Sequence, residues 1–307
     1  MNFMRVLSVV LPVFLVVALG YLFKRKGWIT PAGTDAMKNL VVNVTLPAVL
    51  FGAFWQASYG RANLVCALAM IVLCALGLGL GALLKRLIPN TSPLLPFLCT
   101  GFEAGMLGYS FYILLFGQEA VYQFAILDVG HTFFVFTLYV GLLNARSGKA
   151  AKETLKSMVT SPILIAMLLG VLLGVTGLGA AAVNTAIGDV VNSVVDFVSA
   201  PTACVILFVI GAQMELNPSS IKAAALNVAL RVVVTACLCV LGIFLISRFI
   251  PMTRALTFAL IIMFSLPAPF ILPIYAQSEL EQAQTSTALS LNTLFSIAAF
   301  AVISLFV

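Results

Sequence analysis

Long apolar runs separated by short polar connectors make up most of the chain. A helix that crosses a bilayer needs about 20 mostly apolar residues, and the runs have that length. The pattern therefore predicts an all-α polytopic membrane protein with ten transmembrane helices, near residues 7–23, 38–56, 63–84, 94–116, 120–143, 160–176, 188–213, 223–247, 255–276 and 284–306.

The composition leaves no room for a sizeable soluble domain. Hydrophobic residues make up 62% of the chain and charged residues 8%, whereas a soluble domain carries about a quarter charged residues. The first apolar run has Arg5 before it and the cluster Lys24-Arg25-Lys26 after it. A cleaved signal peptide has the opposite polarity, so this run is predicted to remain as the first span.

The basic residues predict the orientation, because Lys and Arg concentrate in cytoplasmic connectors. With ten spans, eleven basic residues fall on one side and four on the other, which places both termini on the non-cytoplasmic side. The net charge of +6 is explained by these connectors, so we expect no nucleic-acid partner. The eleven are Lys24, Arg25, Lys26, Lys38, Lys85, Arg86, Arg146, Lys149, Lys152, Lys156 and Lys222, and the four are Arg5, Arg61, Arg248 and Arg254.

The spans divide into two sets of five. An odd number of crossings inserts the second set upside down relative to the first, as in transporters with inverted repeats. The predicted organisation is a first five-helix repeat at 1–145, a basic cytoplasmic linker at 146–158 and a second, inverted repeat at 159–307. The second span of each repeat has a proline near its middle, at Pro47 and Pro201.

The fourth span of each repeat is predicted to break at mid-membrane, because glycine weakens a helix and proline interrupts it. Freed backbone groups survive in a membrane only where protein buries them or where they line a wet cavity. Two half-helix N-termini meeting there would favour an anion, although packing alone also explains glycine and proline in such helices. The residues concerned are Gly101, Gly105 and Gly108 in the first repeat and Pro267, Pro269 and Pro273 in the second.

Ionisable residues at membrane depth are costly, so they usually face the interior of a bundle and mark ion or proton pathways. Four acidic or histidine side chains are therefore candidates for coupling: Glu103, Asp128, His131 and Asp196. Asp128 and His131 are neighbours on one helix face and could equally serve to bond each other. Asp196 continues a polar stripe that we expect to face inward. Arg231 is expected to pair with an acid or to extend toward the inner surface, in preference to binding a substrate carboxylate.

Catalytic and metal-binding patterns are absent from the sequence. The six cysteines lie in apolar runs without CxxC spacing, and His131 is the single histidine, so neither a disulfide framework nor a metal site is expected. No HExxH, GxSxG or phosphate-binding loop occurs. These absences disfavour an enzyme and a nucleotide-driven pump, and no cofactor is predicted beyond Na⁺ or H⁺ as a candidate coupling ion.

Several short segments, in this order and spacing, resemble the auxin efflux carrier family in its bacterial members. They are Leu11-Pro12-Val13-Phe14, Gly20-Tyr21-Leu22, the stretch from Leu40 to Pro47, Gly105-Met106-Leu107-Gly108, Ser161-Pro162 with Gly170 and Gly174, Ala200-Pro201 with Gly211-Ala212, and the paired prolines and Ser/Thr-rich run that follow. The resemblance implies ten spans in two inverted repeats, with crossed broken helices 4 and 9, in an architecture similar to bile-acid sodium symporters. It also implies organic anions as substrates and a bacterial inner-membrane location.

The resemblance also implies site positions. Gly105, Gly108, Pro267 and Pro269 take the crossing, with Asn43 and Pro47 beside it, and we add Tyr109 and Asn292 to the predicted substrate-binding residues. Glu103 departs from the small or amide residues expected there, so it could instead bind sodium or a proton, or select a cationic or neutral substrate.

The function predicted from the sequence is secondary active transport of a small organic anion, such as a mono- or dicarboxylate, by alternating access. The alternatives are an uncoupled carrier or channel for a cationic or neutral solute, and a membrane-embedded sensor. The expected partners are the lipid bilayer and the small-molecule substrate, and a homodimer is compatible with the sequence.

Overall fold

The structure is a computed structural model that describes residues 3–57, 60–89, 91–147 and 160–307, with side chains from Val10 onward. Every regular element in these ranges is a helix. In chain order they are α1 (Phe3–Arg25), α2 (Pro31–Leu40), η1 (Val41–Thr45), α3 (Leu46–Phe54), α4 (Arg61–Leu87), α5 (Leu95–Leu98), η2 (Ala104–Gly108), α6 (Tyr109–Phe116), η3 (Gln118–Ala120), α7 (Val121–Phe134), η4 (Val135–Tyr139), α8 (Val140–Arg146), α10 (Pro162–Val175), α11 (Leu178–Ala182), α12 (Ala186–Ser199), α13 (Thr202–Gln213), η5 (Pro218–Ser220), α14 (Ile221–Ser247), α15 (Arg254–Ser265), η6 (Leu272–Tyr275) and α16 (Glu279–Ser304).

The long helices identify a polytopic membrane protein. Six continuous helical stretches among the described residues are long and apolar enough to cross a bilayer. They are Pro31–Phe54, Arg61–Leu87, Gln118–Arg146, Ala186–Gln213, Pro218–Ser247 and Glu279–Ser304, and shorter apolar helices cover Ala104–Phe116, Pro162–Val175 and Arg254–Ser265. Most of the predicted basic linker at 146–158 lies outside the described residues.

Glycines bring the helices of the two halves into close contact. A Cβ atom at Gly20 of α1 would collide with the Phe208 carbonyl oxygen of α13, and one at Gly211 of α13 would collide with the Val17 carbonyl oxygen of α1. Gly170 of α10 likewise faces Phe51 and Phe54 of α3. The first helix of each half therefore packs against the second helix of the other half, and the halves interlock.

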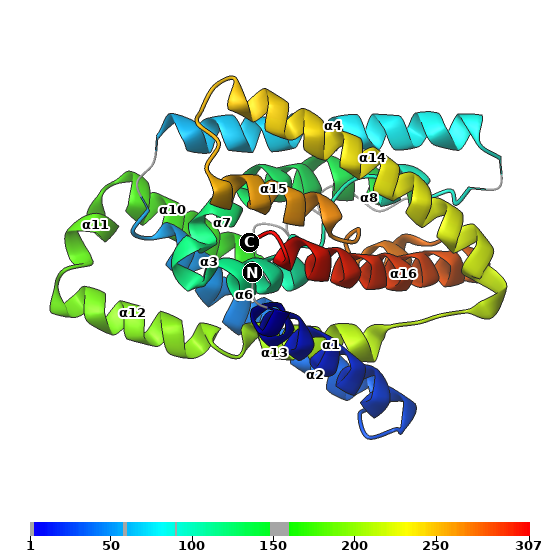
Figure 1. Cartoon of the computed structure of the whole chain (residues 1–307), viewed down its shortest axis with the longest axis horizontal. Helices are drawn as coiled ribbons and strands as arrows, with labels where there is room; N and C mark the ends of the chain where they lie inside the picture. The colour runs from blue at the N-terminus through cyan, green and yellow to red at the C-terminus, as the bar shows by residue number, and fades with distance from the viewer. Residues whose placement is uncertain (1–2, 58–59, 90, 148–159) are drawn as a thin grey trace.

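A second group of helices surrounds the two short interrupted ones. α4 and α14 lie together along one edge of the molecule, α7 packs on α4, and α16 runs beside α14 (Figure 1). A Cβ atom at Gly130 of α7 would collide with the Ala67 carbonyl oxygen of α4, so this pair is also in backbone contact. α5, α6 and α15 pack against these helices.

The interruptions predicted in spans 94–116 and 255–276 are present. The first helix stops at Leu98, and residues 99–103 are non-helical before η2 begins. The second stops at Ser265, and residues 266–271 are non-helical before η6 begins. Both breaks follow from the glycines and prolines that the sequence places there.

Candidate functional site

The two non-helical segments, 99–103 and 266–271, lie against each other, and their contact is termed the junction. The Glu103 backbone N–H donates to the Pro267 carbonyl oxygen at 2.8 Å, and the Phe270 N–H donates to the Glu103 carboxylate at 2.8 Å. Gly101 has a φ of 67°, and a Cβ atom there would lie 3.1 Å from Pro269 Cδ. A glycine at this position allows the left-handed backbone that brings the two segments together.

Arg231, from the middle of α14, stabilises the carbonyl side of the junction. Its guanidinium donates to the carbonyl oxygens of Gly101 at 2.9 Å and Leu266 at 2.8 Å, and also to those of Leu98 and, at 3.5 Å, Thr100. The side chain is 1% exposed. The expectation that Arg231 pairs with an acid or extends to the inner surface was wrong, because its hydrogen-bond partners are backbone groups left free where two helices stop.

Asp128 and His131 bind the other side of the same segment. The Phe102 N–H donates to His131 Nε2 at 2.9 Å, so the proton of a neutral ring lies on Nδ1, which is 2.9 Å from Asp128 Oδ1. Asp128 also accepts from the Tyr109 hydroxyl at 3.0 Å and from Thr132 at 3.3 Å. All of these side chains are buried. The network connects α7 and α6 to the interrupted segment.

Glu103 lies where both second half-helices begin. Its carbonyl oxygen accepts from the N–H groups of Leu107 and Gly108, each at 3.1 Å, at the start of η2. Its half-buried carboxylate accepts from Phe270 just before η6, and it interacts electrostatically with the ammonium of Lys38. The backbone N–H groups at the start of η2 and just before η6 are therefore met by the carbonyl oxygen and the carboxylate of Glu103.

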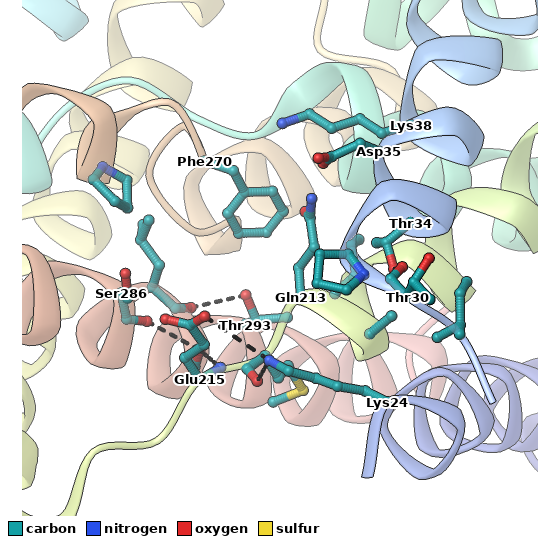
Figure 2. A pocket seen from close by; sticks show the side chains of 18 of the residues that line it. Lys24, Thr30, Thr34, Asp35, Lys38, Gln213, Glu215, Phe270, Ser286 and Thr293 are labelled. Carbon is teal, nitrogen blue, oxygen red and sulfur yellow. Dashed lines mark hydrogen bonds and ion pairs between the residues drawn. The ribbon is translucent and has the colours of Figure 1, made fainter. Parts of the chain in front are cut away.

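A cavity of about 670 Å³ adjoins the junction. It lies between the region where α1 ends and α2 begins, the end of α13, the segment around Phe270, and one face of α16 (Figure 2). Its polar and charged lining residues are Lys24, Thr30, Thr34, Asp35, Lys38, Gln213, Glu215, Gln282, Ser286, Ser290 and Thr293. Phe270 connects the two regions, since its backbone N–H binds Glu103 while the residue lines the cavity.

The cavity walls carry charges of both signs. Lys24 Nζ lies 3.9 Å from Glu215 Oε1 and donates to the Met214 carbonyl oxygen at 2.9 Å. Lys38 and Asp35 lie together on α2, above Phe270 in Figure 2. The segment after α13 is held on α16, because the N–H of Glu215 donates to Ser290 Oγ at 2.9 Å and that of Asn217 to Thr287 Oγ1 at 3.2 Å.

The structure gathers many of the predicted site residues around the junction, but none of them lines the cavity. Gly105 faces Leu46, next to the buried Pro47, and Gly108 is confined by Phe124 and Leu266. Asn292 is buried in a small void that Arg231 also lines. These residues shape the surroundings of the junction and lie behind the cavity wall.

Two predicted residues lie elsewhere. Asn43 is exposed and donates to the Asn39 carbonyl oxygen, so it does not line the junction. Asp196 is exposed on α12, at the edge of the molecule, and so is Ser193, about one turn before it in the same helix (Figure 1). The expectation that the polar stripe of Asp196 faces inward was wrong. α12 packs on α3 through a different face, where Val195 meets Gly52.

Sequence reasoning missed the cavity residues of α2. Thr30, Thr34 and Lys38 follow one another at intervals of four residues, which places them on one helix face, and this spacing was the available signal. Ser286, Ser290 and Thr293, from the Ser/Thr-rich run of the last span, line the α16 wall of the cavity. No group of three or more His, Cys, Asp or Glu side chains that could hold a metal ion occurs in the described part of the chain.

Interrupted helices that meet inside a multi-pass membrane protein, next to a polar cavity, define a protein that moves solutes across a bilayer. Comparison with known families agrees: residues 5–304 match the family model described as membrane transport protein. The chain belongs to this family, that of the auxin efflux carriers. It is also 25% identical over 309 residues to an uncharacterized transporter of Methanothermobacter thermautotrophicus, with 97% of each chain covered. The protein is therefore a membrane-embedded transporter of a small solute and not an enzyme.

Proposed function

We propose that the protein is a secondary transporter that moves a small organic anion by alternating access. The observation that carries this proposal is the cavity of about 670 Å³ that ends on Phe270, one of the residues through which the two interrupted helices contact each other. A cavity that reaches discontinuous helices is where transporters of this kind hold their substrate.

The proposal includes ten spans in two inverted five-helix repeats, with the fourth and ninth crossing at the junction. The six long helices, α1 and the three shorter apolar helices account for ten. The cavity opens beside Lys24 and Glu215, in connectors that the distribution of basic residues assigns to the cytoplasm. The conformation is then inward-facing, with both termini on the other side.

The motion that we propose is a displacement between two helix groups. Glycine contacts join α1 to α13 and α3 to α10, whereas the junction is bonded to α7 and α14. The cavity lies between these groups, since its walls come from α1, α2 and α13 on one side and from Phe270 and α16 on the other. A relative movement would close it on one side of the membrane and open it on the other.

We assign the substrate's negative charge to Lys38 and the coupling proton to Glu103. Lys38 lines the cavity and interacts electrostatically with the Glu103 carboxylate. A proton on Glu103 would remove that competing charge and leave Lys38 to the substrate. Asp128 and His131 are less suited to coupling, because both Asp128 oxygens and both ring nitrogens already have protein partners. Asp196 lies away from the cavity.

A cationic or neutral solute is the second candidate, and one observation favours it. The Glu103 carboxylate already accepts the Phe270 N–H, so a negative charge occupies the place that a substrate anion would take. If Glu103 stays charged throughout the cycle, the site would select against anions.

Uptake into proteoliposomes tests the proposal. We expect the wild type to show saturable uptake of labelled mono- or dicarboxylates. Uptake should be lost in Gly105→Leu and Pro269→Ala. In Glu103→Gln, uptake should no longer respond to a pH gradient. Glu119→Gln, in the short connector at η3, is the matched control for charge removal. Saturable uptake of organic cations alone would support the second candidate, and unitary currents would indicate a channel. Unchanged transport in both Gly105→Leu and Pro269→Ala would disprove the site.

A further inference from the structure

The carbonyl groups around Arg231 form a cluster, and they come from both of the interrupted spans. Leu98 is the last residue of α5, Thr100 and Gly101 lie in the non-helical segment that follows it, and Leu266 directly follows the end of α15. Carbonyl oxygens at and just after these two helix ends have no helical partner, and the C-terminus of the longer helix, α15, also carries a partial negative charge. Two such ends are therefore directed at one guanidinium.

In transporters with discontinuous helices, unwound carbonyls and half-helix C-terminal ends are the groups that coordinate the coupling Na⁺ or H⁺. Carbonyl oxygens are also the ligands that hard cations prefer. Arg231 places a permanent positive charge among such groups, with up to five N–H donors arranged in one plane. The ring of Phe102, 5.4 Å from the guanidinium carbon, covers the cation from the side.

We propose that Arg231 is a built-in cation that takes the place of a sodium ion at the junction, so that the junction assembles without sodium. A metal ion in the same cluster would lie within a few ångströms of the guanidinium, where two positive charges repel strongly. The void that Arg231 shares with Asn227 and Asn292 is too small for a water molecule, so the cluster has no room for an additional hydrated ion. This inference goes beyond the proposed function, in which Glu103 handles a proton.

Thermal unfolding of the purified full-length protein tests the inference without any transported solute. The melting temperature of the wild type is measured in equal concentrations of sodium, potassium and choline chloride. We expect values that agree within about 1 °C, because no site gained by folding binds sodium. A sodium-specific, saturable rise in the wild-type melting temperature would overturn the inference, and it would leave the transport proposal untouched.

Variants then test whether the cluster is a cation site. Arg231→Met should melt several degrees lower, and guanidinium ions at about 10 mM, far below denaturing levels, should restore part of the loss. Arg254→Met is the matched control, because Arg254 also donates to two carbonyl oxygens, those of Phe306 and Val307, but from an exposed position. Its melting temperature should not respond to guanidinium. Equal responses of the two variants would contradict a specific cation site.

A methionine at this position could prevent folding altogether. Arg231→Lys retains the charge with fewer donors, so we expect it to fold with an intermediate melting temperature that is the same in sodium and potassium. A sodium-dependent melting temperature in Arg231→Lys would contradict the inference, because the retained positive charge should still exclude the metal ion. If guanidinium restores neither substituted protein, the cluster is not a cation site.

Discussion

The junction and the cavity share Phe270, yet charge is held differently in the two regions. At the junction, Arg231, Asp128 and His131 are buried and make short hydrogen bonds to neighbouring groups. In the cavity, Lys24 Nζ and Glu215 Oε1 are 3.9 Å apart, and the two side chains are 39% and 64% exposed. The buried charges of the junction therefore stabilise the fold, whereas the exposed charges of the cavity can contact a solute.

The largest effect is expected from Asp128→Ala, which would remove the acceptor of His131, Tyr109 and Thr132 at once. Buried donors without acceptors are costly, so the free energy of unfolding should fall by about 3 kcal/mol or more. Denaturant titration in detergent would measure the loss. Asp35→Ala, at an exposed position in the cavity, should change it by less than about 0.5 kcal/mol. Similar losses in both variants would remove the distinction between the regions.

Gly101→Ala should come next. The left-handed backbone and the Pro269 ring at 3.1 Å both oppose a Cβ atom, so we expect a loss of about 2 kcal/mol of stability. Gly79→Ala in α4 is the control, because a Cβ atom there meets no atom within 4 Å and alanine favours helix. It should be neutral or slightly stabilising. Equal behaviour of the two variants would show that the junction is looser than the structure indicates.

Lys38→Gln sharpens the comparison from the cavity side. It should leave the unfolding free energy within about 0.5 kcal/mol. It should reduce uptake of the substrate anion about tenfold, which corresponds to ~1.4 kcal/mol of lost interaction. Lys222→Gln, on the exposed start of α14, is the control and should transport normally. A loss of stability without a loss of transport would show that Lys38 stabilises the fold and does not bind the substrate.

The smallest effect is expected from Ser290→Ala, which removes the acceptor of the Glu215 N–H. The cost should be about 1 kcal/mol. Hydrogen exchange at the Glu215 amide should accelerate, because the segment after α13 loses one of its two bonds to α16. Ser304→Ala removes a hydroxyl that bonds within its own helix and should leave this amide unchanged. Unaltered exchange in Ser290→Ala would show that Thr287 holds the segment alone.

The sequence was informative about the interruptions and less so about their partners. Glycine weakens a helix and proline removes a backbone donor, so their clustering in two corresponding spans indicated where those spans are interrupted, although isolated cases such as Pro12 and Gly79 lie within continuous helices. The partners of Arg231 are backbone carbonyls, which every residue has, and a sequence therefore gives no sign of them. The cavity walls come from helices of both halves, whose relative positions depend on tertiary contacts.

The position of Asn43 shows a further limit. Residues Val41–Thr45 form a π-helical turn, which adds a residue relative to an α-helix and rotates the following side chains around the axis. A helix face predicted with 3.6 residues per turn is therefore wrong for the residues in and after this turn. Asp196 was misplaced for another reason, because polar periodicity shows that a face differs from its surroundings without showing which side of the molecule it is on.

The buried arginine also bears on how the chain is made. A helix with an arginine at its centre enters lipid at a cost of about 2.5–3.5 kcal/mol on insertion scales. Three of the four carbonyl partners of Arg231 precede α14 in the chain and are synthesised first, whereas Leu266 follows it. Since synthesis proceeds from the N-terminus, the ribosome delivers α14 to a half that already offers most of its ligands. We therefore expect the insertion of α14 to depend on prior folding of the helices that precede it.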